Sequence, residues 1–123
     1  SLLTLNALSC ADYLLVPIQC EYYALEGLTD LLTTIKRLKA SLNPSLELIG
    51  LLRTMYDKRN NLATGVSEQL ITHFGDKVFK TYIPRNVRLA EAPSFGVSAV
   101  MLDSGSLGSQ AYLNVTNELI ERL

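Results

Sequence analysis

The sequence has very few of the residues from which catalytic and metal centres are usually built. Among its 123 residues are one histidine, His73, and two cysteines, Cys10 and Cys20. These are too few and too scattered for a Ser-His-Asp or Cys-His arrangement, a disulfide framework or a zinc site. His73 is expected on the surface near a helix C-terminus, where the helix dipole favours it. Both cysteines lie in apolar surroundings and are expected to be buried free thiols in a reducing cytoplasm.

Long hydrophobic runs and a strong excess of charge are also missing. No apolar run reaches the ~18 residues that suggest a membrane span, and the first residues carry no basic region of the kind that opens a signal peptide. Hydrophobic residues make up 48% of the chain and charged residues 19%, a composition typical of a globular domain. The net charge of −1 excludes a strongly basic domain, although basic residues outnumber acidic ones between residues 53 and 88.

Apolar periodicity predicts alternating helices and strands. The run at 13–18 is continuously apolar, as in a parallel strand that is buried on both faces, and residues 48–55 predict a second buried strand. The predicted elements are, in order, a helix ending near residue 9, a strand over 13–18, a helix over 25–42, a strand over 48–55, a helix over 62–74, strands over 78–83 and 97–102, and a helix over 107–119. This alternation predicts an α/β fold with a parallel β-sheet flanked by helices and right-handed crossovers.

Two polar loops follow neighbouring predicted strands. Thr54–Asp57 comes after the second strand and Pro84–Asn86 after the third, and adjacent parallel strands end at the same edge of a sheet. Met55 offers a soft apolar surface for a flat ring, and the amide of Asn86 can both donate to and accept from the edge of a base. Spacing alone equally allows Asn86 to be a turn residue and Met55 to belong to the core. The sequence contains no G-x-x-x-x-G-K-[ST] phosphate loop.

The run IPRNVRLAEAPS at residues 83–94 closely resembles a segment of the ParA/Soj partitioning ATPases. Further blocks resemble the same family in the same order, at residues 3–8, 16–28, 54–57, 61–62 and 73–78. The resemblance covers essentially the whole chain and implies a P-loop NTPase-like fold of the SIMIBI/ParA type. It also implies that residues 1–123 are the C-terminal half of a single ParA-type ATPase domain, with the Walker A half expected upstream of Ser1.

The resemblance implies an ATPase that acts in chromosome or plasmid partitioning. It implies that ATP and Mg²⁺ are bound through the missing N-terminal half, so no catalytic residue or metal ligand is expected here and the fragment alone should be inactive. The implied partners are a second copy in an ATP-bound homodimer, non-specific DNA, and a ParB/Spo0J-like protein that stimulates hydrolysis. The implied location is the bacterial cytoplasm, in association with the nucleoid and not with a membrane.

Three groups of site residues follow from the resemblance. The nucleotide-binding group is Met55, Pro84, Arg85 and Asn86. The DNA-binding group is Arg59, Lys77, Lys80, Arg85 and Arg88. The dimer or partner face is Glu21, Tyr22, Tyr23 and Glu26. Many relatives carry lysines near the predicted fourth strand, whereas this chain has none over 96–106, so a weaker basic DNA surface is expected.

Two alternatives share the fold. A MinD-like positioning ATPase would end in an amphipathic membrane-targeting helix, but the tail at 117–123 is acidic and has no basic stripe. A non-catalytic interaction module would keep the fold without the ATPase half. The sequence upstream of Ser1 distinguishes the module from the ATPase.

Overall fold

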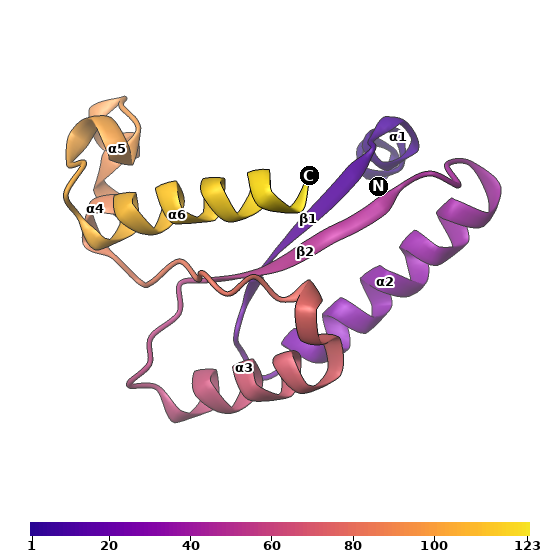
Figure 1. Cartoon of the computed structure of the whole chain (residues 1–123), viewed down its shortest axis with the longest axis horizontal. Coiled ribbons are helices and arrows are strands. Elements are labelled where there is room, and N and C mark those ends of the chain that lie inside the picture. The colour runs from indigo at the N-terminus through magenta and orange to yellow at the C-terminus, as the bar shows by residue number, and fades with distance from the viewer.

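The computed structural model describes residues 1–123 and contains a two-stranded parallel sheet with helices on both of its faces (Figure 1). β1 (Tyr13–Gln19) and β2 (Glu47–Thr54) are joined by α2 (Ala24–Ser41), and α3 (Asn61–Phe74) follows β2. The other helices are α1 (Leu2–Cys10), α4 (Val87–Glu91), α5 (Ala99–Leu102) and α6 (Leu107–Arg122), with 3-10 turns η1 (Gly75–Lys77) and η2 (Ala92–Phe95). No helix is both long enough and apolar enough to cross a membrane. The predicted α/β class, with helices flanking a parallel sheet, is confirmed.

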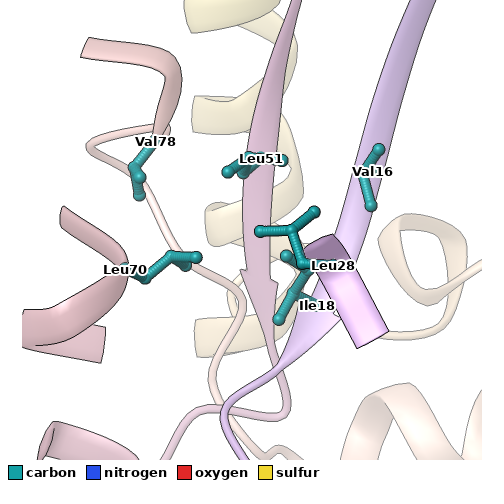
Figure 2. Close-up of a cluster of buried hydrophobic side chains, with 6 residues drawn as sticks. All are labelled: Val16, Ile18, Leu28, Leu51, Leu70 and Val78. Carbon is teal, nitrogen blue, oxygen red and sulfur yellow. The ribbon is translucent and has the colours of Figure 1, made fainter. Parts of the chain in front are cut away.

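The strands bury one set of side chains on each face of the sheet, because successive residues of a strand point in opposite directions. α2 and α3 cover one face and α6 lies on the other (Figure 1). The cluster beneath α2 and α3 consists of Val16, Ile18, Leu28, Leu51, Leu70 and Val78 (Figure 2). The cluster beneath α6 consists of Leu52, Phe79, Ile83, Ala111 and Val115.

The predicted third strand, residues 78–83, lies beside β2 but is not a regular strand. It touches β2 and the residues after it through two isolated parallel bridges, Leu51 with Val78 and Tyr56 with Pro84. The position of this segment next to β2 is as predicted, whereas a continuous strand over 78–83 is wrong.

Side chains account for the interruption of this ladder. The backbone amides of Lys80 and Thr81 donate to the carboxylate of Glu118 on α6, at 2.8 and 2.9 Å. On the other side, the guanidinium of Arg53 donates to the carbonyl oxygens of Phe79 and Lys80, at 3.0 and 3.2 Å. The amides of Lys80 and Thr81 and the carbonyl groups of Phe79 and Lys80 are therefore satisfied by side chains of α6 and β2 in place of a backbone ladder.

The predicted fourth strand, residues 97–102, is also wrong, because its last four residues form α5. The hydroxyl of Ser98 accepts the amide of Met101 at 3.2 Å and so caps the start of this short helix. A short apolar run of this kind does not distinguish strand from helix by periodicity.

Two expectations about single residues have different outcomes. Cys20 is buried as predicted, but Cys10 is exposed at the end of α1, where Leu8 is the buried residue of the helix. His73 is on the surface near the C-terminus of α3 as predicted, and its Nδ1 lies 2.7 Å from the carbonyl oxygen of Gln69.

Charged side chains also donate hydrogen bonds to the carbonyl groups in the first part of β2, along the edge that faces away from β1. The ammonium of Lys77 donates to the carbonyl oxygen of Leu48 at 3.0 Å, and Arg122 Nη1 donates to that of Ile49 at 3.1 Å. The first backbone hydrogen bond from the next segment follows at Leu51, whose oxygen accepts the amide of Phe79 at 2.9 Å.

Candidate nucleotide-base site

The two loops that the sequence predicts at one edge of the sheet lie side by side. The amide of Tyr56 donates to the carbonyl oxygen of Ile83 at 3.0 Å, and the amide of Arg85 donates to that of Tyr56 at 3.3 Å. These two bonds join the residues after β2 to the chain that enters α4. The carboxyl end of β2 and the start of α4 therefore border one space.

A pocket of about 480 Å³ lies between these two segments and α6. Its lining is mostly apolar and consists of Thr54, Met55, Ile83, Pro84, Arg85, Asn86, Val87, Leu89, Ala90 and Tyr112. All four residues of the predicted nucleotide-binding group are in this lining. The size and the apolar walls with a few polar groups are typical of a site for a small organic molecule.

Met55 has an unusual backbone conformation in this pocket. Its φ angle is +48°, and it is the one residue other than glycine with a positive φ in the chain. Such a conformation costs about 1–3 kcal/mol and persists where the surrounding structure enforces it, often at a ligand site. The side chain is 45% exposed, so its thioether is free to contact a ligand.

Asn86 contributes a polar group without a partner. It precedes α4 at the N-cap position, yet its side chain makes no capping hydrogen bond. Its Oδ1 is buried and accepts no hydrogen bond. A buried amide oxygen left in this state costs about 1–3 kcal/mol, which a ligand N–H would recover.

Tyr112 is a lining residue that the resemblance did not indicate. It lies on α6, is 44% exposed and lines the pocket together with residues of the two loops. The signal in the sequence was weak, because an aromatic residue on an amphipathic helix is usually a core residue.

Arg53 is a second functional candidate that sequence reasoning did not single out. It is buried on β2 and forms no ion pair, but it donates to Ser67 Oγ at 3.0 Å. Its guanidinium carbon lies 5.6 and 5.4 Å from the ring centroids of Tyr56 and Tyr82. Both rings offer their π-electrons to the buried cation. An arginine inside the apolar run at 48–55 was the one available signal.

Charged side chains lie in the loop that follows β2, close to the residues that line the pocket. Arg59 binds both carboxylate oxygens of Asp57 at 3.1 Å, and these hydrogen bonds hold the pKa of Asp57 below its ordinary value, with a further contribution from the charge of Arg85. The ammonium of Lys58 lies 5.3 Å from the ring centroid of Tyr82, and the interaction with the phenol raises the pKa of Lys58.

The five residues predicted to bind DNA do not form one surface. Lys77 contacts the start of β2, whereas Arg59 and Arg85 lie beyond its end. Arg88 pairs with Glu91 at 3.0 Å and with Asp103 at 3.3 Å. Lys80 and Arg85 form no ion pair, and their role in DNA binding stays a prediction together with that of the other three.

The predicted partner face is exposed. Tyr22 and Tyr23 lie between β1 and α2, are 74% and 71% exposed, and stack edge to face with ring centroids 4.9 Å apart. Glu21 and Glu26 are exposed beside them. The arrangement suits a contact surface, and its role also stays a prediction.

No group of three or more His, Cys, Asp or Glu side chains lies close enough together to hold a metal ion.

Comparisons with known proteins identify relatives over the whole chain. A sequence model of the family described as "AAA domain" matches residues 1–48. The chain is 52% identical to the chromosome partitioning protein ParA of Caulobacter vibrioides over 99% of this chain and 46% of that protein. It is 54% identical to the chromosome-partitioning ATPase Soj of Thermus thermophilus over 98% of this chain and 49% of that protein. The chain thus spans about half the length of these relatives.

A solved structure shows the same fold. It is cobyrinic acid a,c-diamide synthase from Mycobacterium smegmatis with bound ADP and magnesium, which matches with a TM-score of 0.68 and 31% identity over 91% of this chain and 39% of that protein. The predicted P-loop NTPase-like fold is therefore confirmed. Along almost all of its length the chain is similar to chromosome-partitioning ParA and Soj proteins, and it spans about half of each relative that it matches.

Proposed function

We propose that this chain forms the base-binding part of an ATP-hydrolysing partitioning protein of the ParA/Soj type. Two observations carry the proposal: Asn86 lines the apolar pocket at the end of β2, and its buried Oδ1 has no hydrogen-bond donor. The names of the relatives support an ATPase that acts in chromosome partitioning. The ADP and magnesium in the structural neighbour support ATP and Mg²⁺ as the ligands of the whole protein.

In this proposal the residues of the chain hold the base, and the chemistry takes place elsewhere in the protein. The flat ring of adenine lies against Met55 and the apolar walls near Leu89 and Tyr112. Asn86 Oδ1 accepts a hydrogen bond from the exocyclic amino group of the base. Residues 1–123 act as the C-terminal half of one ATPase domain, with the phosphate-binding loop and Mg²⁺ in the other half, and alone do not hydrolyse ATP.

The finer features of the resemblance belong to the same proposal. The whole protein forms an ATP-bound homodimer, binds DNA without sequence preference and responds to a ParB-like partner in the bacterial cytoplasm. The exposed pair Tyr22 and Tyr23 supplies part of the dimer or partner contact, and Arg85 supplies part of the DNA contact.

Replacing Asn86 by alanine tests the base site. In the full-length gene product, Asn86→Ala should weaken ATP binding about tenfold, because one hydrogen bond to a buried group is worth roughly 1–1.5 kcal/mol. Binding of inorganic tripolyphosphate with Mg²⁺, which has no base, should not change. Titration calorimetry measures both dissociation constants.

The matched control is Asn117→Ala, which removes the same amide from an exposed position on α6. It should leave both dissociation constants unchanged. An unchanged affinity of Asn86→Ala for ATP would remove Asn86 from the site and, with it, the main support for the proposed base pocket.

A further inference from the structure

Residues 80 and 81 have a backbone geometry that a regular strand does not allow. In a strand, successive amide groups point in opposite directions. Here the amides of Lys80 and Thr81 both reach the carboxylate of Glu118, at 2.8 Å from Oε2 and 2.9 Å from Oε1. Both amides therefore point toward α6, and the chain makes a bulge away from β2 at this place.

Arg122 fixes the carboxylate that holds this bulge. Its Nη2 lies 3.1 Å from Glu118 Oε2, one helical turn away, and the two side chains are 21% and 14% exposed. The same Nη2 donates to the carbonyl oxygen of Val78 at 3.2 Å, and the guanidinium carbon lies 4.2 Å from the ring centroid of Phe79. A sheltered ion pair with several hydrogen bonds holds its geometry better than an exposed pair.

The bulge leads directly into the proposed base pocket. Arg53 holds its inner side through the carbonyl oxygens of Phe79 and Lys80. The next backbone bond joins the amide of Ile83 to the carbonyl oxygen of Arg53 at 2.8 Å, and Ile83 already lines the pocket. The path of the bulge therefore sets where Pro84 leaves the sheet.

Helix α6 also contributes a residue to the lining of the pocket. Tyr112 lines the pocket and precedes Glu118 by fewer than two turns, a rise of about 9 Å along the helix. The same helix therefore contributes Tyr112 to the pocket lining and, through Glu118, binds the backbone at residues 80 and 81, which leads to the lining residues Ile83 and Pro84.

We propose that Glu118, oriented by Arg122, is a positioning residue for the base pocket. By binding the amides of Lys80 and Thr81, it sets the separation between Asn86 and the wall formed by Tyr112. The inference rests on the proposed function of the pocket, and it concerns a residue that does not contact the base itself.

Binding of ATP and of inorganic tripolyphosphate to the full-length gene product, each with Mg²⁺, tests this inference. Glu118→Ala should weaken ATP binding about tenfold, because charge-assisted hydrogen bonds to two amides are lost. Tripolyphosphate binding should stay within twofold of the wild type. A purely structural role would leave the ratio of the two dissociation constants as in the wild type.

Two further variants make the comparison specific. Glu121→Ala removes an exposed carboxylate that lies close to Glu118 and Arg122 but makes no hydrogen bond. It should leave the dissociation constants for ATP and for tripolyphosphate unchanged. Glu118→Gln keeps one acceptor oxygen for the amides and should restore part of the ATP affinity. If Glu118→Ala does not fold, Glu118→Asp takes its place, because its shorter side chain cannot reach both amides, and a wild-type ratio in that variant overturns the inference.

The outcomes separate this inference from the function on which it rests. If the wild type binds ATP no more tightly than tripolyphosphate, the base pocket is wrong and the positioning role falls with it. If Asn86→Ala loses the preference for ATP while Glu118→Ala keeps it, the pocket stands and the positioning role is overturned alone.

Discussion

Gly50 lies where β2 passes very close to the buried ring of Phe79. A Cβ atom at this position would be 2.3 Å from Cε1 of that ring and 2.9 Å from the carbonyl oxygen of Lys77. The ring cannot move away easily, because Phe79 is fully buried and packs against the guanidinium of Arg122. Glycine is therefore required at this position by close packing.

Gly50→Ala should lower the free energy of unfolding by about 1–3 kcal/mol, the usual cost of overpacking a core. Urea unfolding of the full-length gene product, followed by circular dichroism, measures this change. Gly27→Ala is the matched control, because nothing lies within 4 Å of the added carbon on α2. It should be neutral or stabilise the helix by up to about 1 kcal/mol. Equal effects of the two substitutions would contradict the packing argument.

Arg53 shows what sequence reasoning misses at the level of single residues. The run at 48–55 correctly predicts a buried strand, but its pattern does not indicate what surrounds Arg53. In the structure Arg53 is buried, because Ser67, two carbonyl groups and two tyrosine rings compensate for lost hydration. Four of these five partners come from other segments of the chain, so no local pattern predicts them.

At the scale of elements, Glu118 makes the contact between α6 and the bulge at residues 80–81 dependent on pH. Burial raises the pKa of Glu118, but the hydrogen bonds from Thr81, Lys80 and Arg122 together lower it below the ordinary value. The folded state thus stabilises the ionised form of Glu118 more than the unfolded state does. The resulting stability is complete above the unfolded pKa of about 4.3 and is lost as the pH falls through the lower folded value.

Glu118→Gln should therefore lower the unfolding free energy most at pH 7. The difference from the wild type should shrink as the pH falls below about 4 and Glu118 becomes protonated. Urea unfolding of the full-length gene product at several pH values measures this trend, with Glu121→Gln as a control that shows no such trend. A difference of constant size at all pH values would mean that the charge of Glu118 is not involved.

The elements that sequence patterns predicted well are those with strong periodicity. The helices at 24–41, 61–74 and 107–122 and the two buried strands lie within a few residues of their predicted bounds. The segments at 78–83 and 97–102 were predicted as strands and are not. The first is bonded to a carboxylate at position 118, far along the chain, and the second is short enough for one serine cap to decide its conformation.

At the scale of the whole molecule, carboxylates pair with two of the five basic residues that are predicted to bind DNA. Arg59 and Arg88 already pair with carboxylates, whereas Arg85 forms no ion pair. Removing Arg85 and Arg88 together should weaken DNA binding by the full-length gene product. It should also reduce the slope of log affinity against log salt by up to about 2, roughly one for each lost phosphate contact.

Fluorescence anisotropy with a duplex of arbitrary sequence, repeated at several salt concentrations, measures this slope. The control removes the same charge from α2 through Lys36→Ala and Arg37→Ala, both exposed residues. If the control changes the slope and the Arg85 and Arg88 variant does not, DNA binds elsewhere on the molecule.

The sequence predicts where the candidate site lies but not all of the residues that line it. The end of β2 and the irregular segment beside it bring Met55 and Asn86 to one edge of the sheet, which the order of the predicted elements indicates. Tyr112 also lines the pocket, and its position depends on how α6 packs against Leu52 and Phe79. A tertiary contact of this kind has no local signal in the sequence.

The charged side chains along the segment next to β2 have a consequence for assembly. An edge strand with free carbonyl and amide groups is a template on which another chain can add a strand. Here Arg122 donates to the carbonyl groups of Lys77 and Val78, and Glu118 accepts the amides of Lys80 and Thr81. Polymerisation by strand addition at this side of the sheet would first have to displace both side chains, so α6 protects the molecule against edge-to-edge aggregation.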